Sequence, residues 1–229
     1  MTLHGVELIQ LEDAEEVAAA VAAELGAAAR AGQAIALTGG TTPGLAYELA
    51  AEQEPDWSHA TVWWGDERCV PPEDERSNYF LARERLLDRL SGQPGAVHRI
   101  RGELGAEAAA REYDEALDGV TLDLVLLGLG PDGHAASLFP GRSTLDERER
   151  RAVPAEAGLE PFIERVTLTV PVLCAAPEVL FIVTGESKAE AVERAFGRPP
   201  DRDTPASLIR STAGRTRVVA DAAAASRLA

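Results

Sequence analysis

The chain has 229 residues, of which 45% are hydrophobic and 26% are charged, and its formal net charge is −16 at pH 7. That length suits a single domain over residues 1–229, large enough to bury a core without disulfides or metal. The negative charge disfavours nucleic acid and anionic membranes as partners. No apolar run approaches the ~20 residues that span a bilayer, and residues 1–10 lack the pattern of a secretory signal. We expect a cytoplasmic protein that is a monomer or a weak homo-oligomer.

In chain order, short β-rich runs alternate with amphipathic segments. We expect a strand at 6–9, a helix at 12–31, a strand at 34–37, a helix at 42–51, a strand at 61–64, helices at 77–90 and 103–117, strands at 122–127, 164–170 and 179–184, a helix at 187–196 and a strand at 216–220. Surface loops are expected at 142–161 and 197–203. This alternation predicts an α/β protein with a mostly parallel sheet covered by helices.

Four segments follow expected strands directly, at residues 38–43, 65–70, 128–138 and 185–188. In open α/β sheets, ligands bind beyond the carboxyl ends of the strands. We therefore expect these segments, although far apart in the sequence, to converge on one binding site.

The first segment, residues 38–43, has the sequence Thr-Gly-Gly-Thr-Thr-Pro. Gly39 and Gly40 allow the backbone to approach a ligand, and the hydroxyls of Thr41 and Thr42 add hydrogen-bond donors. A phosphate at a helix N-terminus needs this combination. The segment is neither GxGxxG nor GxxxxGK[ST]. The alternative is an ordinary helix start with threonine caps and a glycine turn.

The second segment contains Asp66, Glu67 and Arg68. Adjacent side chains cannot share one face of a strand, so these residues should serve different partners. Arg68 suits bidentate recognition of phosphate or carboxylate. The alternative is a cluster of caps and ion pairs.

The third segment, residues 128–134, has the sequence Gly-Leu-Gly-Pro-Asp-Gly-His and follows the most apolar strand. We expect a tight turn that presents His134 near the start of a short helix. Histidine can take a proton from water near neutral pH, and Asp132 could orient the imidazole or hold a substrate hydroxyl. The alternative is a purely structural histidine.

The fourth segment contains Lys188, the only lysine, so the other 21 of the 22 basic residues are arginine. An ammonium is a compact charge that fits phosphate sites where a guanidinium fork does not. A cation in the first turn of a helix opposes the helix dipole, and a bound anion would relieve that conflict. The alternative is a chance lysine on a surface helix. Cys69, Cys174 and the four histidines form no cluster with metal-ligand spacing, so no metal site is expected.

Taken in order, these segments resemble the 6-phosphogluconolactonase family, part of the wider glucosamine-6-phosphate isomerase/6-phosphogluconolactonase group. The likeness covers nearly the whole chain. Its signatures look like residues 38–43, 65–79, 127–141, 165–169 and 185–189, of which 127–141 is the most specific. Ala135 stands where threonine is usual in the family.

The resemblance implies a Rossmann-like α/β fold with helices on both faces, no cofactor, and hydrolysis of 6-phospho-D-glucono-1,5-lactone to 6-phospho-D-gluconate in the pentose phosphate pathway. It implies that His134 is the general base. The candidate site residues are His134 and Asp132 for catalysis, with Gly39, Gly40, Thr41, Thr42, Asp66, Arg68, Gly133, Arg142, Arg165 and Lys188 for substrate or phosphate binding.

Two other functions fit parts of this pattern. A glucosamine-6-phosphate deaminase would continue after Asp-Gly-His toward Phe-Asn-Glu-Pro, whereas residues 137–141 have the sequence Ser-Leu-Phe-Pro-Gly and contain no acid. Deaminases also tend to have tyrosine in place of Arg68. A non-catalytic sugar-phosphate sensor usually carries a DNA-binding segment, for which a first strand beginning at Val6 leaves no room. Ammonia release would indicate the deaminase, and ligand binding without turnover would indicate the sensor.

Overall fold

The computed structural model describes residues 2–158 and 162–228. The strands are β1 Thr2–Leu3, β2 Val6–Leu11, β3 Ala34–Leu37, β4 Thr61–Trp64, β5 Asp66–Arg68, β6 Ala96–Val97, β7 Leu124–Leu127, β8 Ala152–Ala155, β9 Arg165–Leu168, β10 Glu178–Val183 and β11 Arg215–Asp221. The helices are α1 Ala14–Arg30, α2 Pro43–Gln53, α3 Asn78–Arg85, α4 Ala106–Ala116, α5 Val170–Ala175 and α6 Ala189–Phe196. Single turns of 3-10 helix lie at Leu87–Arg89, Gly102–Leu104, Ser143–Asp146, Glu186–Lys188 and Pro205–Leu208.

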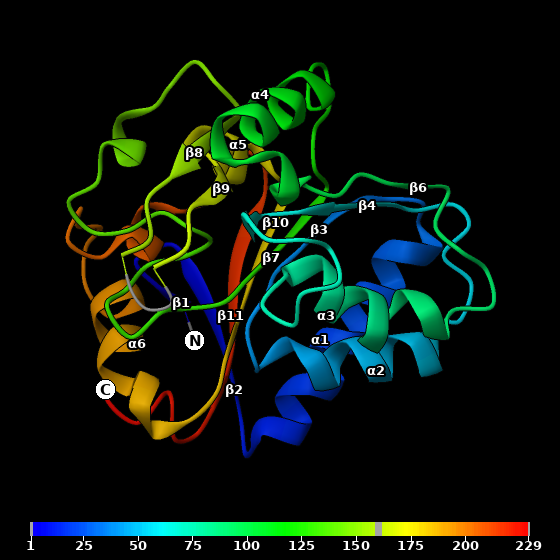
Figure 1. The fold of residues 1–229 in the computed structure, drawn as a ribbon. Coiled ribbons are helices and arrows are strands. Elements are labelled where there is room, and N and C mark those ends of the chain that lie inside the picture. Colours follow the sequence, from blue (N-terminus) through cyan, green and yellow to red (C-terminus); the bar gives the residue numbers. More distant parts are fainter. Residues whose placement is uncertain (1, 159–161, 229) are drawn as a thin grey trace.

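The main sheet has eight strands in the order β1-β2-β11-β10-β7-β3-β4-β6 (Figure 1). All neighbours pair in parallel except β1, which is antiparallel to β2 at one edge. The mostly parallel sheet expected from the sequence is therefore confirmed. No helix in the described part of the chain is long and apolar enough to cross a membrane.

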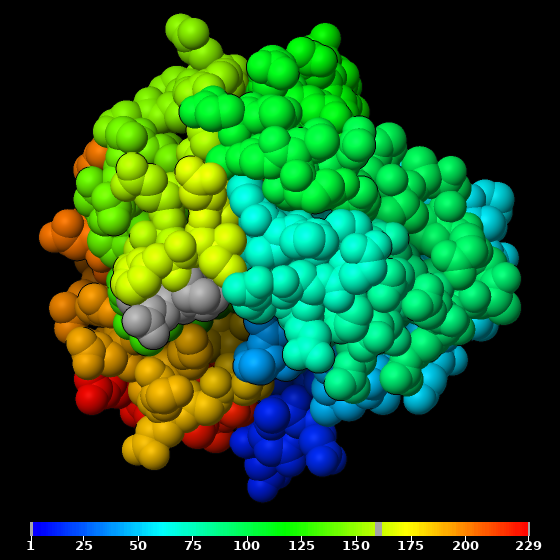
Figure 2. Space-filling model, in the orientation of Figure 1, coloured from blue at the N-terminus to red at the C-terminus, as the bar shows by residue number. Residues whose placement is uncertain are grey.

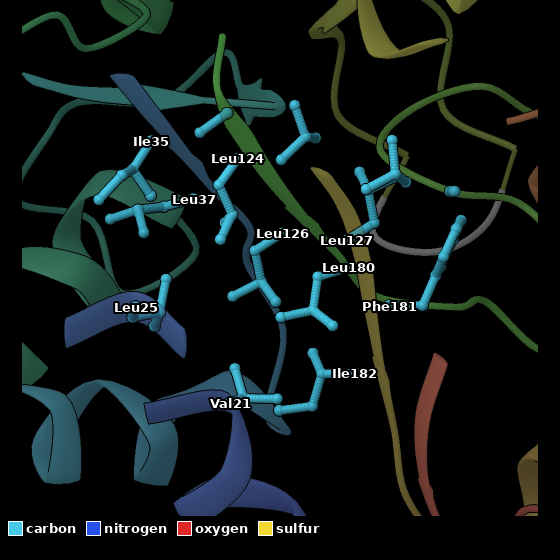
Figure 3. Packing of buried hydrophobic residues seen from close by; sticks show 14 of the residues in the cluster. Val21, Leu25, Ile35, Leu37, Leu124, Leu126, Leu127, Leu180, Phe181 and Ile182 are labelled. Carbon is cyan, nitrogen blue, oxygen red and sulfur yellow. The ribbon is translucent and has the colours of Figure 1, made fainter. Parts of the chain in front are cut away.

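Helices cover both faces of this sheet, because successive side chains of a strand point to opposite faces. Figure 3 shows Leu126 and Ile182 pointing toward Val21 of α1. Phe181 points to the other face and contacts Phe196 of α6, with ring centroids 5.0 Å apart. Both faces are thus packed with apolar side chains, which explains why β7 and β10 have continuous rather than alternating hydrophobic sequences.

A second, antiparallel sheet has the strand order β5-β9-β8, and α4 packs on it. In Figure 2 the yellow chain that contains β9 lies against the cyan chain that contains β5. The strand expected at 164–170 is β9 of this second sheet, and it ends at Leu168 because Val170 and Pro171 begin α5. The loop expected at 142–161 contains β8, and its residues 159–161 lie outside the described range.

Several element boundaries differ from those expected. Ser77 caps α3 by accepting a hydrogen bond from Phe80 N at 3.1 Å, but the helix ends at Arg85 rather than at residue 90. Gly105, with a φ of 82°, stops α4 from starting before Ala106. The strand at 122–127 begins only at Leu124. The loop at 197–203 is confirmed, since residues 198–203 are exposed.

The chain order creates a switch point in the sheet. From β3 the chain continues through α2 to β4 on one side, and from β7 it continues to β10 and β11 on the other. β3 and β7 are neighbours, with Ala36 paired to Val125. Connections that leave neighbouring strands in opposite directions open a crevice at the carboxyl ends of those strands.

Candidate active site

A cavity of about 210 Å³ occupies this crevice. Its lining comes from residues 38–43 after β3, Asp66 and Arg68 of β5, residues 128–131 and His134 after β7, Arg165 of β9, and residues 182–184 and Lys188 around the end of β10. The convergence of the four segments is therefore confirmed. Within residues 2–158 and 162–228 there is no group of histidine, cysteine or carboxylate side chains that could hold a metal ion.

Two buried tyrosines fix the ends of the strands beneath the cavity. The Tyr47 hydroxyl of α2 accepts from Thr38 N at 3.0 Å and donates to Thr38 O at 2.6 Å. The Tyr113 hydroxyl of α4 does the same with Trp64, at 2.8 and 3.0 Å. Burial raises the pKa of both hydroxyls, so they remain protonated donors. Each tyrosine therefore bonds to a backbone N–H and a backbone C=O group at a strand end, where a neighbouring strand no longer provides the partner.

The N-terminus of α2 lines the cavity and is open to an anion. Thr42, the residue before the helix, forms no side-chain cap, and the first turn contains no acid. Pro43, the first residue of the helix, has no N–H, so the N–H groups that follow it in the first turn and the positive end of the helix dipole are available to a ligand. The backbone of Gly39 lies so close to Asn78 that a Cβ would sit 1.7 Å from Asn78 Oδ1. The glycine is needed for close packing at this point.

His134 and Asp132 form a pair at the edge of the cavity. Nδ1 of His134 lies 2.5 Å from Oδ1 of Asp132, and this same oxygen accepts from His134 N at 3.2 Å. Burial raises the pKa of Asp132, but the hydrogen bonds from His134 outweigh it and leave that pKa below its ordinary value. In the tautomer with its hydrogen on Nδ1, the His134 ring donates to Asp132 and has its lone pair on Nε2. Nε2 has no hydrogen-bond partner among the residues described.

The turn before His134 is closed by its own backbone. Gly130 N donates to His134 O at 2.9 Å, and Gly133 N donates to Gly130 O at 3.0 Å. Gly133 has a φ of 88°, which favours glycine. The short helix expected to follow His134 is absent from this described stretch, where Ala135 and Leu138 form an isolated bridge instead. The expectation was wrong because the turn closes on itself rather than continuing as a helix.

Two arginines face the cavity from the second sheet. Nη1 of Arg68 donates to Arg76 O at 2.6 Å, which holds the guanidinium in place. Arg165 lies over the ring of Phe139, 5.6 Å from its centroid, and burial lowers its pKa. The Nε atoms of Arg68 and Arg165 are buried and lack a partner among the described residues.

Lys188 reaches the cavity from the 3-10 turn that directly precedes α6. Its Nζ donates to Leu129 O at 2.8 Å. Burial lowers the pKa of Lys188, while the charge of Asp132 acts in the opposite direction. With Arg68 and Arg165, the cavity lining has three cationic side chains and one carboxylate, in a chain whose net charge is −16.

The neighbouring acids of β5 accept from different groups, although both contact Asn78. Asp66 accepts from Ser137 Oγ at 2.5 Å and from Asn78 Nδ2 at 3.1 Å. Glu67 is buried and accepts from Ser77 Oγ at 2.8 Å and from the backbone N–H groups at the start of α3. Asn78 was not among the candidates, although it lines the cavity. Asn78 lies within the family signature at residues 65–79, and this could have identified it from the sequence.

The structure brings most candidates together, but not all of them. Gly39, Gly40, Thr41 and Thr42, along with Asp66, Arg68, His134, Arg165 and Lys188, line the cavity. Asp132 and Gly133 lie behind His134 and shape its turn. Arg142 lies elsewhere, where its Nη1 is 2.8 Å from Glu156 Oε2 and both side chains are largely exposed.

This fold and cavity define an α/β protein that can hold a small anionic ligand where its sheet changes direction. Residues 11–218 match the family described as glucosamine-6-phosphate isomerases/6-phosphogluconolactonase. The chain belongs to the 6-phosphogluconolactonase family within that superfamily.

Individual relatives agree with this assignment. Human 6-phosphogluconolactonase is 39% identical over 211 residues, which cover 87% of this chain and 82% of that protein. The 6-phosphogluconolactonase of Streptomyces coelicolor is 36% identical and covers 97% and 94% of the two chains. The solved 6-phosphogluconolactonase of Trypanosoma cruzi has a TM-score of 0.87 at 25% identity and covers 100% and 98%.

Proposed function

We propose that this protein hydrolyses 6-phospho-D-glucono-1,5-lactone to 6-phospho-D-gluconate, with His134 as general base. The observation that carries the proposal is the 2.5 Å contact between His134 Nδ1 and Asp132 Oδ1 beside a cavity lined by three cations. Membership of a family whose relatives carry the name 6-phosphogluconolactonase supports the choice of substrate.

The reaction needs a base that can return its proton. Nε2 of His134 takes a proton from water as the water oxygen bonds to C1 of the lactone, and the carbonyl electrons move to the carbonyl oxygen. When the tetrahedral intermediate collapses, the bond between C1 and the ring oxygen breaks. The ring oxygen takes the proton from the imidazolium and becomes a hydroxyl group. Such acid–base assistance contributes about 10²–10⁴-fold, and Asp132 stabilises the transient imidazolium.

The oxyanion of the intermediate needs a donor nearby. The N–H groups of Gly130, Gly133 and His134 are already used within the turn. The backbone of this turn therefore has no free donor for the oxyanion at these three residues, and an arginine is the better candidate to stabilise it. Arg165 is the candidate, because it lines the cavity, lies over Phe139 next to the His134 ring, and has a buried Nε without a described partner.

The phosphate is remote from the reacting carbon and would anchor the substrate. The free N–H groups at the start of α2, the hydroxyls of Thr41 and Thr42, and the charges of Arg68 and Lys188 offer donors for it. Binding energy from a remote group holds the lactone in reach of the base. An ammonium and a guanidinium within one small cavity also explain how an acidic protein would accept an anionic substrate.

The decisive test is lactone hydrolysis, followed as acid release above the uncatalysed background. We expect turnover by the wild type, and a fall in kcat of about 10²–10⁴-fold with little change in KM for His134→Ala. Near-normal turnover by His134→Ala would remove His134 from the mechanism. Wild-type protein that releases no acid above background would remove the proposed function.

A further inference from the structure

A buried carboxylate stands behind the turn that carries Lys188. Asp221 is the last residue of β11 and is 6% exposed. Its Oδ2 and Oδ1 accept from Gly185 N at 2.9 and 3.1 Å, and its Oδ1 also accepts from Ala224 N at 2.7 Å. Asp221 does not line the cavity. It connects the end of β11 to the second residue after the neighbouring strand β10.

Asp221 holds Gly185, and the backbone of Gly185 sets the position of the turn that carries Lys188. Gly185 has a φ of 93° and a ψ of 147°, a backbone conformation that is open essentially to glycine alone. Its carbonyl accepts from Lys188 N at 3.0 Å, which closes the 3-10 turn Glu186–Lys188. Three residues of backbone therefore separate the carboxylate contact from the ammonium, which donates to Leu129 O at 2.8 Å.

We propose that Asp221 is a positioning residue for substrate binding, which acts through Gly185 to hold the Lys188 ammonium in the cavity. The proposal rests on the proposed function, because Lys188 is assigned there to the substrate phosphate. Without the carboxylate, Gly185 N loses its partner and the turn is free to rotate. Lys188 would then spend part of its time out of reach of the phosphate.

The sign of the effect separates positioning from simple electrostatics. Asp221 is an anion close to a site for an anionic substrate, so removing its charge alone should strengthen substrate binding and lower KM. Loss of the Lys188 position should raise KM instead. Asp221→Asn separates the two effects. An amide oxygen in the place of Oδ1 still accepts from Gly185 N and Ala224 N, while the charge and the bond from Gly185 N to Oδ2 are gone.

The experiment is a double-mutant cycle on the full chain, with KM and kcat for lactone hydrolysis and thermal unfolding measured for each variant. The variants are Asp221→Ala, Asp221→Asn, Lys188→Ala and the Asp221→Ala/Lys188→Ala double variant. Asp123→Ala is the matched control, because Asp123 Oδ2 accepts from Ala34 N at 2.8 Å at the opposite end of the same sheet. If wild-type protein does not hydrolyse the lactone, the proposed function fails, whatever the variants do.

With an active wild type, we expect Asp221→Ala to raise KM by roughly 3- to 10-fold and to change kcat less than about twofold. Asp221→Asn should return KM to the wild-type value or below it, because Gly185 is still held while the repelling charge is gone. In the Lys188→Ala background, Asp221→Ala should change KM by less than about twofold, because the group it positions is already gone. Asp123→Ala should lower thermal stability and leave KM unchanged.

Three results would overturn the inference: an unchanged KM in Asp221→Ala, a lowered KM, or the same rise in KM whether or not Lys188 is present. If Asp221→Ala does not fold, Gly185→Ala provides the second route. A Cβ at Gly185 would meet nothing within 4 Å, so that change strains the turn alone and leaves Asp221 in place. Gly185→Ala should raise KM when Lys188 is present and leave it unchanged when combined with Lys188→Ala. An equal rise in both backgrounds would again contradict the proposal.

Discussion

Replacing Gly130 by alanine tests whether the position of the His134 ring, rather than its mere presence, sets the rate. A Cβ on Gly130 would lie 2.0 Å from His134 Nδ1 and 2.1 Å from Cε1. Real Cβ contacts are essentially never shorter than 3.0 Å, so the ring and the turn must move apart by at least 3.0 − 2.0 = 1.0 Å. A misplacement of about 1 Å can cost about 10²-fold in rate. We therefore expect kcat to fall about 100-fold.

Gly128→Ala supplies the matched control for this prediction. Gly128 lies two residues before this turn and lines the same cavity, but a Cβ there would meet nothing within 4 Å. Both residues have negative φ, so alanine adds no backbone strain at either position. Initial rates of lactone hydrolysis should fall steeply for Gly130→Ala and stay within about threefold of wild type for Gly128→Ala. Equal rates for the two variants would refute the link between the ring position and catalysis.

Two further predictions concern charge. The ammonium of Lys188, whose pKa burial lowers, is lost as pH rises through that pKa. The Kd for 6-phosphogluconate should therefore rise in the wild type at a pH below the ordinary lysine pKa of about 10.4 and stay flat in Lys188→Arg, because a guanidinium remains protonated there. Calorimetric titration checks this, and parallel pH profiles would refute it. Arg217, 5% exposed, bonds to Glu24 at 2.7 Å and Glu178 at 2.6 Å. Arg217→Ala should lower the free energy of unfolding by about 2 kcal/mol in urea titrations at neutral pH, since Glu24 loses its ion-pair partner and Glu178 keeps only Arg215. Arg217 lowers the pKa of Glu24, so this stabilisation is present above the ordinary carboxyl pKa and is lost as pH falls through the lowered one; a difference that persists in acid would contradict this account.

The sequence was sufficient to predict six of the eight strands of the main sheet and the meeting of four segments, but not the two-residue edge strands β1 and β6. Strands such as β7 and β10, apolar on both faces, are typical of a buried parallel sheet, and in such a sheet the carboxyl ends lie together. Residues 38–43, 128–134 and Lys188 could therefore be assigned to one site without knowing any distance. His134 and Asp132 are two residues apart, so their contact depends on a local turn that the glycines indicate.

The remaining features depend on contacts between distant residues. β5 is three polar residues long, and only its pairing with β9 makes it a strand. The Asp221–Gly185 contact joins residues 36 positions apart, and nothing near Asp221 in the sequence indicates a role at the site. Arg142 and Arg165 look alike in sequence, yet Arg165 lines the cavity and Arg142 pairs with Glu156. Side-chain direction at the end of a loop is set by tertiary packing, which periodicity does not report.

The paired hydrogen bonds of Tyr47 and Tyr113 make the strand ends beneath the cavity structurally independent of the loops around it. Each hydroxyl replaces the neighbouring strand for one residue, so the backbone at Thr38 and Trp64 is fully satisfied without help from the loops that follow. The loops can then change in length or sequence while the strand ends beneath them keep their positions. In evolutionary terms, these loops can acquire a new substrate preference while the strand ends that support them stay unchanged.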